Sequence, residues 1–88
     1  MPYISQGQRE PFDIKGLEIY TLTDKIGGPG ELNYVITRIL TQFAANRGES
    51  YSTYNEIIGV LECVKQEFYR RAVVPFEEGK LKQNGDVY

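Results

Sequence analysis

The sequence predicts an all-α fold, a small antiparallel helical hairpin with flanking short helices that forms oligomers. Two long segments, residues 31–46 and 54–74, repeat apolar side chains at helical spacing. The link between them, residues 49–52, is short, which favours antiparallel neighbours. A chain of 88 residues buries a modest fraction of its surface and is only marginally stable alone. We therefore expect it to be stabilised by association between copies. We expect a single helical domain over residues 1–88.

The longest predicted helix covers residues 54–74. Thr53 and Glu56 have the spacing of a capping box at its start. Pro75 is expected to end it, because proline lacks an N–H group and pushes the preceding residue out of the α region. One face is apolar at helical spacing: Ile57, Leu61, Val64 and Phe68.

The opposite face of this helix carries a small-xxx-small pair, Gly59 and Cys63, followed by Gln66. Small residues let another backbone approach closely, and a glycine inside a helix costs about 1 kcal/mol relative to alanine. These three residues are therefore the predicted oligomer interface. The alternative is a tolerated glycine on a solvated face.

Residues 31–46 form the second predicted helix, which ends at Asn46–Gly48. Its core stripe consists of Leu32, Val35, Ile36, Ile39, Leu40 and Phe43. Tyr34 and Arg38 lie one turn apart on the other side. They form either a stacking platform beside a cation or part of a solvated face.

The remaining segments are shorter. Residues 1–12 are expected to form an irregular arm, since Gly7 and Pro11 leave little room for a helix after Ser5. Residues 13–26 fit a helix or a strand, and helix is favoured because a lone strand has no evident partner. Residues 27–30 read as a turn, and residues 76–88 as an extended or partly helical tail.

Composition excludes several classes of function. A net charge of −2 and a pI of about 5.1 disfavour binding to duplex nucleic acid. No apolar run reaches the roughly 18 residues of a membrane span and no secretory signal is evident, so a cytoplasmic protein without membrane contact is expected. The chain has no histidine and one cysteine, so no metal site, cofactor or catalytic residue is predicted, and an enzyme is the least supported class.

The densest group of aromatic and cationic side chains comprises Lys65, Tyr69, Arg70 and Arg71. Such a group suits a nucleotide, with a base stacked on the ring and phosphate on the cations. Together with Tyr34 and Arg38 it forms the predicted ligand site. The alternative is that the two arginines only complement the helix dipole.

Three blocks of sequence carry a family resemblance. They are LNYVITRIL (residues 32–40), NEIIGVLECVKQEFYRR (residues 55–71) and NGDVY (residues 84–88). The chain resembles a small uncharacterised protein family seen in bacteriophages and in bacterial and archaeal genomes. In size and style it is also similar to the short helical-hairpin proteins with which phages sequester nucleotide signals of host immunity.

These observations lead to one functional expectation and two alternatives. The leading expectation is a non-catalytic homo-oligomeric protein that sequesters a small anionic, nucleotide-like ligand, as in phage counter-defence. The first alternative is a protein-interaction module without a small ligand. The second is an uncharacterised enzyme.

Overall fold

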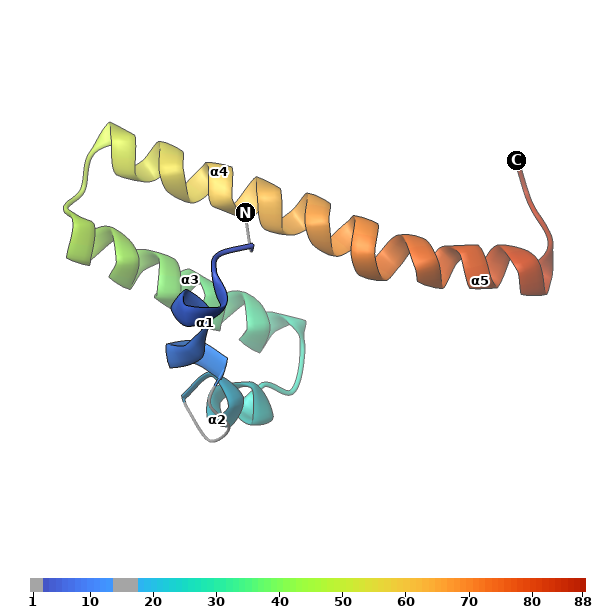
Figure 1. Cartoon of the computed structure of the whole chain (residues 1–88), viewed down its shortest axis with the longest axis horizontal. Helices are drawn as coiled ribbons and strands as arrows, with labels where there is room; N and C mark the ends of the chain where they lie inside the picture. The colour runs from blue at the N-terminus through green and yellow to red at the C-terminus, as the bar shows by residue number, and fades with distance from the viewer. Residues whose placement is uncertain (1–2, 14–17) are drawn as a thin grey trace. The chain divides into compact units, whose positions relative to one another are not determined.

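All secondary-structure elements among the described residues are helical. The computed structural model describes residues 3–13 and 18–88. Its elements in order are α1 (Gln6–Asp13), α2 (Glu18–Lys25), α3 (Pro29–Arg47), α4 (Tyr51–Phe68), the π-helical turn η1 (Tyr69–Val73) and α5 (Val74–Asn84). These residues contain no strand, which confirms the all-α class (Figure 1). The chain divides into two compact units, Pro2–Tyr54 and Asn55–Tyr88, and each is described by itself.

The N-terminal segment is a helix, not the predicted irregular arm. Gln8 N–H donates to Ser5 Oγ at 3.2 Å, and Ser5 N–H donates to Gln8 Oε1 at 3.0 Å. This reciprocal pair is a capping box, and it satisfies backbone groups at the start of α1. Pro11 lies inside the helix without ending it. Local capping outweighed the propensities of Gly7 and Pro11.

The ambiguous segment 13–26 is helical where the structure describes it. Its residues Glu18–Lys25 form α2, which confirms helix over strand for that part. Residues 14–17 of the segment lie outside the described residues.

Helix α3 begins at Pro29, directly after Gly28. Proline suits a first helical position because its missing N–H would have had no partner within the helix. Gly27 N–H donates to Glu31 Oε1 at 2.6 Å. The glycine-rich turn therefore presents one of its N–H groups to a carboxylate of the same chain, as expected of a structural connector.

A three-residue link, residues 48–50, joins α3 to α4. Gly48 ends α3 with φ of 91°, and its N–H donates to Ala44 O at 2.9 Å. The positive φ explains the glycine, since other residues rarely adopt it. Ser50 caps α4, because its Oγ accepts from Thr53 N–H at 3.1 Å.

The predicted capping box at Thr53 is therefore wrong by one turn. Helix α4 starts at Tyr51, and Thr53 belongs to its first turn. Thr53 Oγ1 donates to Gly48 O at 3.0 Å instead of capping the helix. Both Ser50 and Thr53 have side chains that can cap, and the earlier residue takes that role.

The helix does not end at Pro75 as the sequence predicted. Elements α4, η1 and α5 follow one another without a break, and the ribbon runs on through the orange part of Figure 1. Val74 N–H donates to Tyr69 O, an i to i−5 bond of the π-helical turn. The wider turn accommodates the proline, whose ring would otherwise clash with the carbonyl four residues earlier. Residues 85–88 follow α5 without helix.

Few side chains are buried. Among the described residues the buried ones are Ala44 and Thr53. Several residues of the predicted core stripes are exposed, including Leu32, Ile39, Val64 and Phe68. The sequence pattern located the apolar faces, but this structure of one chain leaves much of them uncovered.

Candidate ligand site

An open groove of about 660 Å³ runs along α3 in the first unit. Its lining combines rings, aliphatic side chains, amides and one cation: Leu22, Tyr34, Val35, Arg38, Ile39, Gln42, Phe43 and Asn46. Helix α3 supplies all of them except Leu22, which comes from α2. The groove thus brings together Tyr34 and Arg38, two of the residues predicted to bind ligand.

Arg38 is the distinctive group of this groove. Within the described part of the chain its side chain makes no hydrogen bond or ion pair. Arginine binds phosphate and carboxylate groups with two parallel N–H donors. Tyr34 lies one turn before it and is 62% exposed, so its ring is open to a planar ligand.

The C-terminal end of the groove has two side-chain contacts. Gln42 Nε2 donates to Asn46 Oδ1 at 2.9 Å, which fixes one amide against the other. The guanidinium carbon of Arg47 lies 5.5 Å from the centre of the Phe43 ring, a cation–π distance. The sequence assigned Phe43 to the core stripe and did not place Leu22, Gln42 or Asn46 at a site. The i to i+4 spacing of Gln42 and Asn46 can be read from the sequence. The contribution of Leu22 from α2 cannot, because it depends on the fold.

The second predicted group, on α4 and η1, is differently arranged. Lys65 Nζ lies 3.5 Å from Glu62 Oε1, and Arg70 forms an ion pair with Glu67. Both cations thus have a carboxylate of their own helix as a partner. A ligand phosphate must compete with that carboxylate, which weakens the predicted anion clamp.

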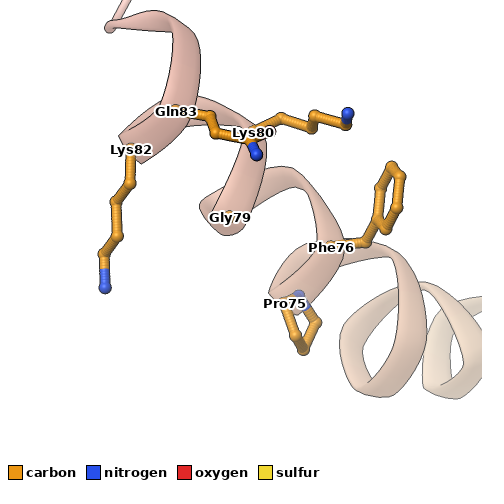
Figure 2. A pocket seen from close by; sticks show the side chains of 6 residues that line it. All are labelled: Pro75, Phe76, Gly79, Lys80, Lys82 and Gln83. Carbon is orange, nitrogen blue, oxygen red and sulfur yellow. The ribbon is translucent and has the colours of Figure 1, made fainter.

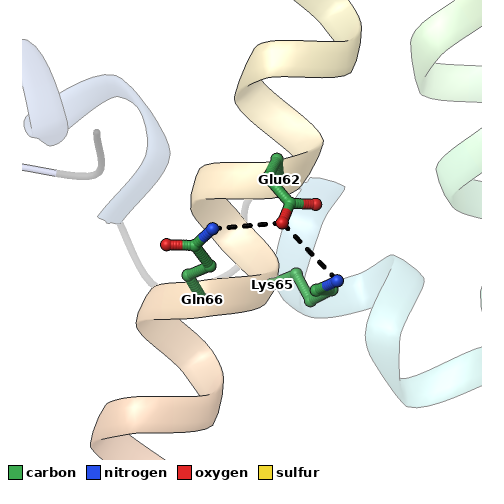
Figure 3. A network of polar contacts seen from close by, with 3 residues as sticks. All are labelled: Glu62, Lys65 and Gln66. Carbon is green, nitrogen blue, oxygen red and sulfur yellow. Dashed lines mark hydrogen bonds and ion pairs between the residues drawn. The ribbon is translucent and has the colours of Figure 1, made fainter.

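Glu62 sits at the centre of a small polar network, shown in Figure 3. Its Oε1 accepts from Gln66 Nε2 at 3.0 Å and faces the ammonium of Lys65. The hydrogen bond from Gln66, followed by the charge of Lys65, lowers the pKa of the Glu62 carboxyl. A carboxylate that is stabilised by two donors stays ionised to lower pH.

The other two members of the group are more open. Tyr69 is 57% exposed, and Arg71 makes no hydrogen bond or ion pair with the described residues. Arg71 therefore resembles Arg38, since neither cation has a partner in the described part of the chain. Unlike Arg38, it does not line the groove along α3.

The predicted oligomer residues lie along α4 in different environments. Gly59 is exposed, and a Cβ atom built on it would meet nothing within 4 Å. Cys63 is half-buried and free. Gln66 is exposed and holds Glu62.

A comparison with protein families finds one match that covers almost the whole chain. The family is described as Domain of unknown function (DUF6899), and it matches residues 1–87. The chain belongs to the DUF6899 family. This agrees with the resemblance to an uncharacterised family. Comparisons with curated proteins and with solved structures found no match.

This DUF6899 chain has a second hollow on α5, with a volume of about 490 Å³. It is lined by Pro75, Phe76, Gly79, Lys80, Lys82 and Gln83. In Figure 2 the Lys80 side chain lies on the same side of the helix as Phe76, and its ammonium is 5.6 Å from the centre of that ring. Lys82 points in another direction, so the two ammonium groups do not converge on one point.

The described residues of the DUF6899 chain offer neither a metal-binding cluster nor a helix that could span a membrane. They contain no group of three or more cysteine, histidine or acidic side chains placed to hold a metal ion. None of their helices combines the length and the apolar character that crossing a lipid bilayer demands.

Proposed function

We propose that this DUF6899 protein is a non-catalytic, homo-oligomeric binding protein that holds a small anionic, nucleotide-like ligand in the groove along α3. The observation that carries the proposal is the Arg38 guanidinium, which has no hydrogen bond or ion pair among the described residues, beside the open Tyr34 ring in one groove. A base or another planar ring stacks on tyrosine, and a phosphate binds arginine. Sequestration of an immune signal by a phage protein is the biological role that fits such a ligand.

The volume and chemistry of the groove suit this class of ligand. Small-molecule sites span about 300–1,000 Å³ and combine apolar walls with a few polar groups. Leu22, Ile39 and Phe43 supply the apolar wall, while Gln42 and Asn46 supply amides that can bind the edge of a base. The groove thus offers an apolar wall, a tyrosine ring for stacking and an arginine for a phosphate.

Calorimetric titration against a panel of cyclic nucleotides and ADP-ribose derivatives tests the proposal. The account predicts measurable heat with at least one of them and a loss of affinity of roughly 10- to 100-fold in Arg38→Gln, since hydrogen bonds to charged groups contribute about 1.5–3 kcal/mol. Arg71→Gln is the matched control, because Arg71 is also a helix arginine without a hydrogen bond or ion pair to residues 3–13 and 18–88, but it lies outside the groove. No heat across the panel, or equal losses in the two variants, contradicts the assignment.

A second candidate function is a protein-interaction module. The exposed apolar side chains of α4 and α5, such as Ile58 and Phe76, favour it. Large exposed apolar surface is typical of protein interfaces. A pull-down that retains one host or phage protein, and loses it with Gly59→Leu, supports this function instead of ligand binding.

A further inference from the structure

Apolar side chains recur at every fourth residue along the continuous helix of the second unit. The row consists of Val60, Val64, Phe68, Ala72 and Phe76. Its four large members are 52%, 53%, 65% and 64% exposed, in chain order, and Ala72 is exposed too. We call these five residues the apolar row. It is the longest regular series of exposed apolar side chains on this helix.

The π-helical turn keeps the apolar row on one face. In an α-helix, residues four apart are offset by about 40° at each step, so such a row winds around the helix. A π-helical turn holds more residues per turn and takes back part of that offset. Element η1 lies between Phe68 and Phe76, so it turns Phe76 back toward the face of Phe68. In a regular α-helix, Pro75 would lie on that face instead. The turn that accommodates the proline thus also aligns two aromatic side chains.

Charge divides the same helix into two halves of opposite sign. The half from Asn55 to Glu67 has a formal charge of −2, with Lys65 and three glutamates: Glu56, Glu62 and Glu67. The half from Phe68 to Asn84 has a formal charge of +2. It carries Arg70, Arg71, Lys80 and Lys82 against Glu77 and Glu78. A helix of this kind attracts a second copy only when the two run in opposite directions.

We propose that the apolar row packs against the apolar row of a second copy, antiparallel, with the two Phe68 side chains at the twofold axis. A twofold interface is self-complementary, so each pairing occurs twice. In this register Val60 faces Phe76, and Val64 faces Ala72, which alternates large with small side chains. Glu56 then lies opposite Lys80, and each acidic half lies along a basic half.

The surface offered is of the size that a dimer needs. Aromatic side chains bury about 150–250 Å² each, so two phenylalanines that are two-thirds exposed supply roughly a third of the ~800 Å² per partner of a standard interface. The two valines, Ala72 and the flanking side chains supply more. This inference depends on the homo-oligomer of the proposed function and not on its ligand.

Disulfide trapping locates the interface. In a Cys63→Ser background, which removes the native thiol, the account predicts that Phe68→Cys forms a covalent dimer on mild oxidation. Gln66→Cys in the same background is the matched control, since Gln66 is an exposed residue on the opposite face. A dimer with Gln66→Cys and none with Phe68→Cys overturns the proposal in favour of the Gly59–Cys63–Gln66 face. No dimer with either variant overturns it as well.

A mixing experiment determines whether the two helices run antiparallel or parallel, and it leaves Phe68 and Phe76 unchanged. Val64→Cys and Ala72→Cys, each in the Cys63→Ser background, are oxidised alone and then as an equal mixture. The antiparallel register predicts a covalent dimer that contains one copy of each variant and little dimer in either sample alone. Homodimers in the separate samples indicate a parallel pair and contradict the register.

Ligand titration of the same variants separates the two proposals. Failure of trapping with ligand heat retained overturns the antiparallel pair alone. Successful trapping without heat for any nucleotide overturns the ligand and leaves the pair. Circular dichroism of each variant shows that its helices are intact before disulfide trapping or ligand titration is interpreted.

Discussion

The hydroxyl of Thr53 donates a hydrogen bond to the carbonyl oxygen of Gly48 at 3.0 Å, and Thr53 is 5% exposed. This bond ties the first turn of α4 to the residue that ends α3. It is one of the few contacts in the described chain that is shielded from water. Hydrogen bonds of this kind contribute more when water cannot replace either partner.

Thr53→Val should destabilise the protein by about 1–2 kcal/mol, because the isosteric side chain leaves the Gly48 carbonyl without its donor. Denaturant unfolding at a fixed protein concentration measures the change. Thr41→Val is the control, since the Thr41 hydroxyl donates to Arg38 O on the exposed surface of α3. Equal losses in the two variants argue against a special role for the Thr53 bond.

Ser50→Ala should cost about 1 kcal/mol, because it removes the side chain that accepts from Thr53 N–H at the start of α4. Ser52→Ala is matched in chemistry and lies inside the helix, where alanine is favourable. The same unfolding measurement should therefore show a loss for Ser50 and no loss for Ser52. The reverse order contradicts the placement of the cap.

The residues at the junction of α3 and α4 show how much of the fold can be predicted from the sequence. Apolar spacing located both long helices, because residues such as Val35 and Leu61 recur on one face at a helical period. The exact start of α4 was missed because two competent capping residues, Ser50 and Thr53, stand three positions apart. The passage through Pro75 was missed because a π-helical turn depends on an i to i−5 bond, for which the sequence has no marker.

The candidate site was predictable only in part. The pairing of Tyr34 with Arg38 follows from their spacing, and both line the α3 groove. Leu22 reaches the same groove only through the fold of the chain around the turn at residues 27–30. The local ion pairs of Lys65 and Arg70 depended on which rotamers their side chains adopt, and i to i+3 spacing alone does not decide that.

Gly59→Ala and Gly79→Ala should each stabilise the protein by about 0.5–1 kcal/mol. Both glycines lie inside helices, and a Cβ atom built on either meets nothing within 4 Å. Gly79 serves as the control, because no close approach of a second backbone was predicted there. If Gly59→Ala destabilises while Gly79→Ala stabilises, a second backbone packs on Gly59 and the interface lies on the Gly59–Cys63–Gln66 face.

The pKa of Glu62 should lie below that of an ordinary glutamate and should rise in Gln66→Ala, which removes the hydrogen bond that contributes most. A carboxyl whose pKa is lower in the folded state stabilises that state above its unfolded pKa. That contribution is lost as the pH falls through its folded pKa. NMR titration of the side-chain carboxyl measures the midpoint. Gln83→Ala, on α5, should leave it unchanged, and an unaltered midpoint in Gln66→Ala contradicts the network.

Tyr34→Leu should weaken ligand binding by roughly tenfold or more, since stacking of a base on an aromatic ring contributes about 1–3 kcal/mol. Tyr51→Leu is the control, because Tyr51 is 83% exposed and lies outside the groove. Calorimetry with the nucleotide that gives the largest heat measures both. A loss confined to Tyr51→Leu would falsify the placement of the ligand on α3.

Sedimentation equilibrium of the unmodified protein over a wide concentration range tests the central claim most directly: the exposed apolar row is covered by another copy of the chain. The account predicts a dimer or a larger assembly at micromolar concentration, which dissociates on dilution and in Phe68→Glu. A protein that stays monomeric at every concentration, with Phe68 open to solvent, contradicts it.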